Sequence, residues 1–398
     1  MLRCGFGLLW LAGAAAVATA SASSPRASAS AAVTPSSSAS PRALPRAVVG
    51  GYSSWGHCGD DIVRACEQGV NVVYWFAINL APSPTGLDLD CIANVSATLR
   101  ALSLPTTHMV SVGGWDAPHP TGYANASAMY SEWKAWNEHV VARPGLETGF
   151  DGVDWDLEGA DNVSSPTNSM TPQTLDLVGG FSQLAKADGY LVTLVPCESY
   201  LDPTTSRFDG SLLWAYPEWH PEFKYHGHNA YAYLLSRYGT TVAAREPSAL
   251  STSSVQTFDA VTIQLYESFA HASFNTSERE PPQTGAEYLE SWVPRLAAGW
   301  DVDFGSAPEF GWPSATVSVP AQQLVLGLGN GWAGGPDHKS VLLMPDQLAA
   351  AWASLAARNL SVRGGTFWSI PQEGTVPPAG GSPLFLAIAL NSILHTRD

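Results

Sequence analysis

The segment 149–159, GFDGVDWDLEG, places four acidic side chains in a run whose other members are glycine and large apolar residues. Burying an isolated carboxylate is costly, so such groups are paired, metal-bound, protonated or used in chemistry. Strand side chains alternate between faces, which puts Asp154, Asp156 and Glu158 on one side. Three acids therefore share one small volume, whereas Asp151, of opposite parity, is expected to bond neighbouring backbone amides.

Crowded carboxyl groups suit acid and base catalysis. They cannot all ionise at neutral pH, so one keeps a proton that it can donate while a neighbour stays charged. Glycoside hydrolysis uses this division of labour. Residues two apart on a strand are separated by about 7 Å, so we expect the side chains of Asp156 and Glu158 to hydrogen-bond, with Glu158 reaching outward as the acid.

Metal binding is the competing use of these acids. The run from Asp154 to Glu158 imitates the start of a calcium-binding loop, but the twelfth position of such a loop should be Glu and is Ser165 here. His226 and His228 lack an acidic or third histidine ligand nearby in sequence, so we expect solvated loop histidines. We therefore expect no metal and no cofactor.

Eight short apolar runs alternate with segments of helical periodicity. The strands are expected at 47–55, 69–80, 107–115, 149–158, 189–199, 258–268, 323–332 and 364–373. This alternation predicts an α/β fold, a (β/α)8 TIM barrel, in which functional residues lie at the carboxyl ends of the strands. A doubly wound open sheet is the alternative, but no strand precedes a glycine-rich phosphate-binding turn.

Two connections are too long for plain barrel links. Long insertions are expected after strands 5 and 6, at 199–257 and 268–321. Both are rich in aromatic residues, which either stack on sugar rings in a groove or pack a small core.

Charge and the N-terminal composition limit the partners and the compartment. The chain has 19 Lys and Arg against 35 Asp and Glu, a formal net charge of −16, which argues against nucleic acid or anionic membrane as partner. Residues 1–20 resemble a secretory signal peptide, with an uncleaved anchor as the alternative. Residues 21–45, almost entirely Ser, Ala and Pro, predict a disordered leader. One catalytic domain is expected over 46–398, secreted or lumenal and monomeric.

Cysteines and sequons agree with a secretory route. Five Asn-x-Ser/Thr sequons begin at Asn94, Asn125, Asn162, Asn275 and Asn359. Loss of Cys4 with the signal would leave Cys58, Cys66, Cys91 and Cys197, an even number suited to disulfides. We favour a Cys66–Cys91 pair, because each lies in an expected helix flanking one strand; free buried thiols are the alternative.

A resemblance to a known family rests on these motifs. DGVDWDLE at 151–158 matches the Asp-Gly-x-Asp-x-Asp-x-Glu signature of glycoside hydrolase family 18, the chitinases and related endo-β-N-acetylglucosaminidases. SVGG at 111–114 resembles the end of the family's third strand, and QLYE at 264–267 resembles the sixth-strand motif of its plant and fungal chitinase branch. Trp368 stands where the last strand offers a sugar-stacking tryptophan. The resemblance covers roughly residues 46–373.

The resemblance implies a role for each site residue. Glu158 would protonate the leaving glycosidic oxygen and later activate water, while the substrate's own 2-acetamido oxygen attacks the anomeric carbon. Asp156 would orient that acetamide and stabilise the oxazolinium intermediate, and Asp154 would tune the proton shared with Asp156. Tyr266 would hold the acetamide carbonyl, and Trp368 would stack on the sugar beside the scissile bond.

Further residues are candidate substrate contacts. Gln264 and Tyr52 are second contributors, with core packing the equal alternative for Tyr52. Gly113 and Gly114 either let the backbone approach a ligand or form a bulge without ligand contact. Trp115 lines the groove or packs under a loop.

Two acids depart from the pattern or stand outside it. Glu267 is one methylene longer than the Asp or Asn usual after the motif tyrosine, which puts the substrate contacts there in doubt. Strand 5 ends in PCES, so Cys197 and Glu198 are expected near the mouth of the cleft, and for Glu198 we expect solvation rather than a bond to a sugar hydroxyl.

The sequence thus predicts a secreted, retaining, substrate-assisted hydrolase of β-1,4-linked N-acetylglucosamine, as chitin or chitooligosaccharides. Within the same chemistry, the alternative is an endo-β-N-acetylglucosaminidase acting on N-glycans. Outside it, the alternative is a sugar-binding lectin of the same fold, which commonly lacks the acid at the Glu158 position.

Overall fold

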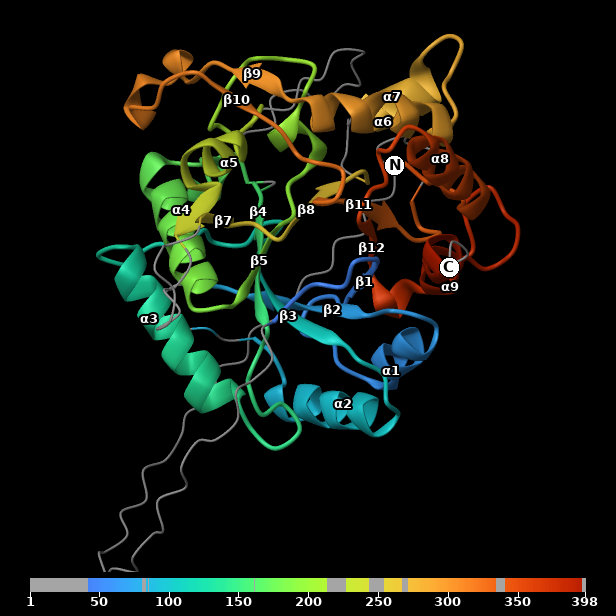
Figure 1. Ribbon diagram of the computed structural model, residues 1–398, viewed down its shortest axis with the longest axis horizontal. Coiled ribbons are helices and arrows are strands. Elements are labelled where there is room, and N and C mark those ends of the chain that lie inside the picture. The colour runs from blue at the N-terminus through green and yellow to red at the C-terminus, as the bar shows by residue number, and fades with distance from the viewer. Residues whose placement is uncertain are drawn as a thin grey trace, which may run out of the picture. The chain divides into compact units, whose positions relative to one another are not determined.

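The computed structural model describes residues 42–80, 84, 86–160, 162–212, 227–242, 254–266, 271–333 and 341–395. Eight parallel strands close into a barrel in the order β1-β12-β11-β8-β5-β4-β3-β2, with helices around it (Figure 1). The barrel strands are β1 (Val48–Tyr52), β2 (Val72–Ile78), β3 (Thr107–Gly114), β4 (Gly152–Leu157), β5 (Leu191–Leu194), β8 (Ala260–Gln264), β11 (Leu324–Gly329) and β12 (Gly364–Trp368). The predicted TIM barrel is confirmed, and each strand is shorter than expected because the flanking residues turn into loops.

The helices begin where the sequence offers caps. Asn125 and Thr171 accept backbone hydrogen bonds at the starts of two of them, and Thr284 forms a capping box with Glu287 at the start of a third. The helices are α1 (Asp60–Glu67), α2 (Leu89–Ala101), α3 (Ala126–Trp136), α4 (Pro172–Ala187), α5 (Ala232–Tyr238), α6 (His271–Ser273), α7 (Gly285–Ala298), α8 (Pro345–Ala357) and α9 (Leu386–His395).

Strand β4 shows how the alternation of side chains builds two layers. Trp155 is fully buried on the helix side, where its ring lies edge-on to Phe181 at 5.1 Å and its Nε1 donates to Ser182 at 3.0 Å. Asp154 faces the opposite way, into the barrel, and bonds to residues of other strands. The predicted parity of the acidic run is therefore confirmed.

The described parts of the two insertions pack into the hydrophobic core that surrounds the barrel. They include the two-stranded sheets β6 (Thr240–Val242) with β7 (Ser254–Gln256) and β9 (Trp300–Val302) with β10 (Ala315–Val317). Figure 1 shows β9 and β10 beside α5. Tyr231 and Tyr233 are fully buried, and the ring of Tyr233 lies edge-on to Phe310 at 5.2 Å. For these aromatics core packing, not sugar stacking, is the outcome; Trp214, Tyr216, Trp219 and Tyr225 lie outside the described residues.

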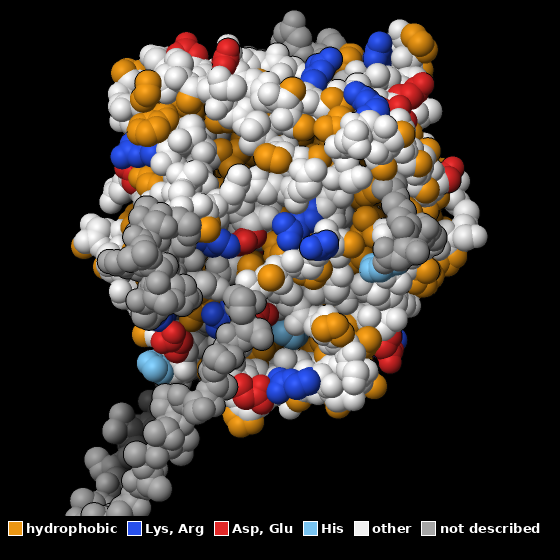
Figure 2. Space-filling view, viewed as in Figure 1, with side chains coloured by type: hydrophobic (Ala, Val, Ile, Leu, Met, Phe, Trp, Pro, Cys, Tyr) orange, Lys and Arg blue, Asp and Glu red, His pale blue; other side chains and the backbone are white. Residues whose placement is uncertain are grey.

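The surface carries both signs of charge. On the face shown in Figure 2, basic and acidic side chains are interspersed rather than gathered by sign. In the part of the chain that the structure describes, no helix has both the length and the apolar character required to span a membrane.

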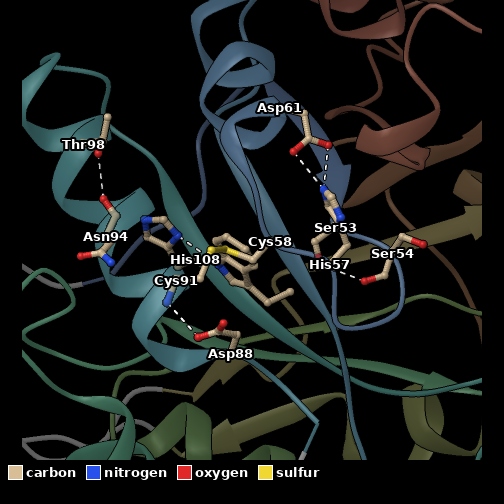
Figure 3. Close-up of a disulfide and its surroundings, with 11 residues drawn as sticks. Ser53, Ser54, His57, Cys58, Asp61, Asp88, Cys91, Asn94, Thr98 and His108 are labelled. Carbon is tan, nitrogen blue, oxygen red and sulfur yellow. Dashed lines mark hydrogen bonds and ion pairs between the residues drawn. A yellow bond between two sulfur atoms is a disulfide. The ribbon is translucent and has the colours of Figure 1, made fainter.

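The disulfide joins Cys58 to Cys91, so the expected Cys66–Cys91 pair is wrong. Cys66 is on the buried face of α1 at 3% exposure and contributes to the core, whereas Cys58 lies in the turn before that helix. Figure 3 shows the bond between this turn and the first turn of α2, where Asp88 accepts the backbone N–H of Cys91 at 3.0 Å. Cys66 and Cys197 are buried thiols.

We predict that the double variant Cys58→Ser/Cys91→Ser loses about 3–4 kcal/mol of unfolding free energy, because the bond closes a loop with a sequence separation of 33 residues. Urea unfolding with and without reductant measures it. Cys66→Ala is the matched control and should not abolish the effect of reductant. A reductant effect that survives in the double variant would contradict the assignment.

Candidate active site

Asp154 lies inside the barrel among hydroxyl groups. Its side chain is fully buried; Oδ2 accepts hydrogen bonds from Tyr52 at 3.0 Å and Ser111 at 2.9 Å, and Oδ1 accepts one from Thr193 at 2.5 Å. Burial raises the pKa of Asp154 to about 6, and the three donors limit the rise. Strands β1, β3 and β5 each supply one of these hydroxyls, so the closed barrel is what satisfies this carboxyl.

Asp156 and Glu158 follow on the same face, and one side-chain amide joins them. Gln264 Nε2 donates to Asp156 Oδ1 at 2.9 Å and lies 3.4 Å from Glu158 Oε1. The same nitrogen donates to the Val195 carbonyl at 2.9 Å, which fixes its position. Asp156 is 5% exposed and Glu158 is half-buried, so the outermost acid is the one that meets solvent at the end of the barrel.

The carboxyl groups of Asp156 and Glu158 hydrogen-bond to each other, as expected, and titrate as a pair. Burial and the negative charge of Glu158 hold the pKa of Asp156 well above its usual range. Burial also raises the pKa of Glu158, while hydrogen bonds from Asp156, Gln264 and Cys197 oppose the rise. The Cys197 thiol lies 3.6 Å from Glu158 Oε2. The pair therefore retains a proton that a fully hydrated pair would lose.

Tyr266 stands at the end of β8 beside the acids. Burial and the charges of Asp156 and Glu158 raise the pKa of its hydroxyl well above the usual range, so the tyrosine stays protonated and can donate. Its half-buried ring lies edge-on to Trp332 at 5.9 Å. Trp332 in turn donates from Nε1 to the carbonyl of Trp368 at 2.9 Å.

An aromatic group continues from the acids to the surface. Tyr52 is 2% exposed, so its hydroxyl serves Asp154 and its ring packs in the barrel. The half-buried Trp368 lies 5.9 Å from Tyr52 and is edge-on to Phe76 at 4.7 Å. Trp55, 55% exposed, also lies edge-on to Phe76 at 4.7 Å and 6.5 Å from Trp368. The group presents two tryptophans, of which Trp55 is the more exposed.

Gly113 and Gly114 are required by protein contacts. Both have positive φ, 110° and 102°. A methyl group at 113 would lie 2.1 Å from the Asp156 carbonyl oxygen, and one at 114 would lie 2.4 Å from Phe76 Cζ. Close approach of β4 and of an aromatic ring therefore accounts for the two glycines. Trp115, which follows them, is half-buried.

Comparison with known proteins bears on the fold. No protein-family model matches the chain, and no curated protein matches it either. Among solved structures, the ChiA C-terminal domain of Legionella pneumophila is 14% identical, with a TM-score of 0.50, over 81% of this chain and 93% of that domain. A family GH18 chitinase catalytic domain from the fern Peteris ryukyuensis is 13% identical, with a TM-score of 0.47, over 87% of this chain and 99% of that one. A chitinase from Chromobacterium violaceum is 13% identical, with a TM-score of 0.47, over 88% of this chain and 100% of that one.

The protein shares the (β/α)8 barrel fold of the ChiA C-terminal domain. At these identities the likeness concerns the barrel and its helices. Within the described residues, no three His, Cys, Asp or Glu side chains are placed to hold a metal ion together.

Several side chains at the carboxyl end of the barrel were not predicted from the sequence. His119 Nε2 bonds the backbone carbonyl of Glu158 at 2.8 Å, and the Tyr231 hydroxyl accepts the backbone N–H of Leu157 at 2.7 Å. Cys197 was placed near the barrel mouth without a role. Trp55 and Trp332 also belong to the site. Each ends an expected strand, and this position at a strand end is the sequence feature that could have identified both.

Other expectations have definite outcomes. Asp151 accepts the backbone N–H of His108 at 2.8 Å, which confirms its structural role. His228 is 8% exposed and burial lowers its pKa, so the expectation of a solvated histidine is wrong. Glu267 and His226 lie outside the described residues.

Glu198 is buried at 1% exposure, so its expected solvation is also wrong. It accepts hydrogen bonds from the Tyr288 hydroxyl and from the backbone N–H of Ala272, the latter at 3.3 Å. Burial raises the pKa of Glu198 to about 7, and the nearby His271 opposes the rise. The carboxyl thus joins the end of β5 to the second insertion.

We predict that Glu198→Gln flattens part of the dependence of stability on pH. The folded protein holds a proton on Glu198 that the unfolded chain releases, so unfolding free energy falls as pH rises from 4.5 to about 7. The variant lacks this loss of unfolding free energy, which we place at about 3 kcal/mol for a pKa raised from 4.5 to about 7. Urea unfolding of both proteins from pH 4 to 8 gives the difference curve, in which a constant offset from altered hydrogen bonding has no slope. A flat difference curve would refute the raised pKa.

Proposed function

We propose that the protein belongs to glycoside hydrolase family 18 and hydrolyses β-1,4-linked N-acetylglucosamine in chitin or chitooligosaccharides, with retention of configuration. The observation that carries the proposal is the line of Asp154, Asp156 and Glu158 on β4. Buried donors hold the inner two, and the half-buried third meets solvent. A barrel fold shared with chitinases supports it.

In the first step Glu158 gives its proton to the glycosidic oxygen of the leaving sugar. Burial raises the pKa of Glu158, which favours the protonated form that this step requires. The substrate's acetamido oxygen attacks the anomeric carbon from the other face, and the C–O bond to the leaving group breaks as the proton arrives. No nucleophile from the protein is needed.

Asp156 and Tyr266 act on the acetamido group. Asp156 accepts the amide hydrogen of the substrate and, as negative charge moves onto it, stabilises the positive oxazolinium. The protonated Tyr266 hydroxyl beside it donates to the acetamide carbonyl and aligns it for attack. Asp154, with a pKa of about 6, stands behind Asp156, and its charge contributes to the raised pKa of Asp156.

In the second step Glu158, now a carboxylate, removes a proton from water that attacks the anomeric carbon. The oxazolinium opens and returns the acetamido group with the original configuration. Gln264 contacts both Asp156 and Glu158, so it keeps the carboxyls aligned through both steps.

Secretion belongs to the same proposal. The disulfide suits an oxidising compartment. Four sequon asparagines are exposed, and they are Asn94, Asn125, Asn162 and Asn359. We propose a monomeric catalytic domain over 46–398 that follows a cleaved signal at 1–20 and a leader at 21–45.

We predict that Glu158→Gln lowers kcat on chitohexaose by at least about 100-fold, because the variant has no proton to donate, while hexamer binding persists. Product analysis and tryptophan fluorescence measure the two. Glu198→Gln is the control, because Glu198 is a buried acid that bonds to the second insertion instead of to Asp156. Full activity of Glu158→Gln would refute the assigned role.

The same assay separates the substrate classes. A high-mannose glycoprotein is incubated in parallel with the hexamer. We expect cleavage of the hexamer; cleavage of the glycoprotein alone would place the protein among the endo-β-N-acetylglucosaminidases, and binding of the hexamer without cleavage would place it among the lectins.

We predict that Trp55→Ala weakens the binding of chitohexaose about 10-fold but leaves the binding of the dimer unchanged, because an exposed ring beyond Trp368 contacts only longer chains. Calorimetry on the Glu158→Gln background checks this without turnover. Ile388→Ala, which removes an exposed apolar side chain from α9, is the control. An equal loss for dimer and hexamer would contradict the prediction.

A further inference from the structure

The end of β4 extends beyond its pairing with β5. The two strands are in register from Gly152 to Trp155, and the last bond between them runs from Val195 N–H to the Trp155 carbonyl at 3.0 Å. Backbone groups of alternate residues face the same neighbour, so Leu157 presents its N–H to the side that β5 has already left. A buried N–H without a partner is costly. The Leu157 N–H, between Asp156 and Glu158 at the end of β4, therefore needs another acceptor in place of a carbonyl of β5.

Tyr231 supplies the substitute. Its hydroxyl oxygen accepts the Leu157 N–H at 2.7 Å and lies 3.3 Å from the carbonyl oxygens of both Trp155 and Leu157, which share its single hydrogen as acceptors. The side chain is fully buried, and its ring stacks on Tyr200 at 5.9 Å with an interplanar angle of 12°. One hydroxyl from the insertion after β5 thus takes the place of a strand.

His119 holds the next residue from another direction. Its Nε2 lies 2.8 Å from the backbone carbonyl of Glu158, and a carbonyl only accepts, so Nε2 carries the hydrogen. His119 is 5% exposed, and burial lowers its pKa. The last two residues of the acidic run are therefore held by side chains from two loops.

We infer that Tyr231 is a positioning residue for Glu158: its hydroxyl completes β4 beyond β5 and so sets where the acid stands. The catalytic part of this inference rests on the proposed hydrolase function. The structural part, the hydrogen bond between Tyr231 and Leu157, is independent of that function. The insertion after β5 is thereby a component of the acid-bearing strand and not only a wall beside it.

A phenylalanine at 231 fills the same volume and removes only the hydroxyl. The ring would still stack on Tyr200, while the Leu157 N–H would lose its acceptor and the end of β4 would shift. Small displacements of a proton donor cost up to about 100-fold in rate. We expect Tyr231→Phe to lower kcat on chitohexaose about 10-fold or more, with KM nearly unchanged, because the sugar-binding surfaces stay in place.

Tyr233→Phe is the matched control. Tyr233 is two residues away and equally buried, and it too has a bonded hydroxyl, which donates to Asp176 at 2.9 Å on α4 instead of to β4. We expect a comparable fall in melting temperature for both variants and a fall in kcat for Tyr231→Phe alone. Equal kcat in the two variants, or a change confined to KM, would overturn the inference.

A second measurement does not depend on activity. Amide hydrogen exchange at Leu157 should be faster in Tyr231→Phe than in Tyr233→Phe, and equal exchange would overturn the inference even if kcat changed. If Tyr231→Phe does not fold, His119→Leu removes the other support and His119→Gln restores a donor; kcat should fall in the first and partly recover in the second, and no difference would count against positioning of this strand end. An inactive wild type with fast exchange in Tyr231→Phe would instead reject the proposed function and leave the bond to Leu157 standing.

Discussion

Three carboxyl groups on one face of a buried strand are unfavourable in free energy, and the surrounding structure must offset this cost. Asp154, Asp156 and Glu158 repel one another when ionised, and each is removed from bulk water to a different degree. Such a group is stable only where donors reach every carboxyl or where protons remain bound. Both conditions hold here, since hydroxyls and one amide supply the donors and the pKa values are raised.

The closed barrel is the arrangement that brings those donors together. Tyr52, Thr193 and Gln264 are far apart in sequence, yet parallel strands bring their carboxyl ends to one edge. An open sheet would leave β4 with donors from two neighbours only. In the barrel, β1 is three strands away from β4, and its tyrosine reaches Asp154 through the interior.

Features set by local periodicity could be predicted from the sequence, and features set by register could not. The alternation along 149–158 fixed which acids share a face, and the spacing of apolar runs fixed the barrel. The partner of Cys91 depended instead on which residue of the turn before α1 faces α2, a rotation that no periodicity specifies. Glu198 follows a strand end, as exposed residues do, but a helix from a distant insertion covers it.

The same limit applies to Tyr231 and Cys197. An aromatic residue in an insertion suggests either a binding surface or a small core, and nothing local indicates that its hydroxyl bonds a strand more than 70 positions earlier. The thiol of Cys197 reaches Glu158 because the residues after β5 run beside β8, where the backbones of Cys197 and Gln264 form a parallel β-bridge. Side chains that complete a site from a neighbouring strand are visible only once the register is known.

The order of the acids along β4 matches a gradient of access to water, and this gradient explains why the outermost one is glutamate. Asp154 is fully enclosed by the barrel. Asp156 is 5% exposed and is hydrogen-bonded to Gln264 and to Glu158. The outermost acid contacts both solvent and the buried carboxyl of Asp156 behind it. Glu158 is half-buried, and its additional methylene lets the carboxyl touch Asp156 while its edge faces outward. The shorter side chain of an aspartate could not reach Asp156 and solvent at the same time. The length of the glutamate side chain is therefore required by the same burial that raises the pKa values of Asp154 and Asp156.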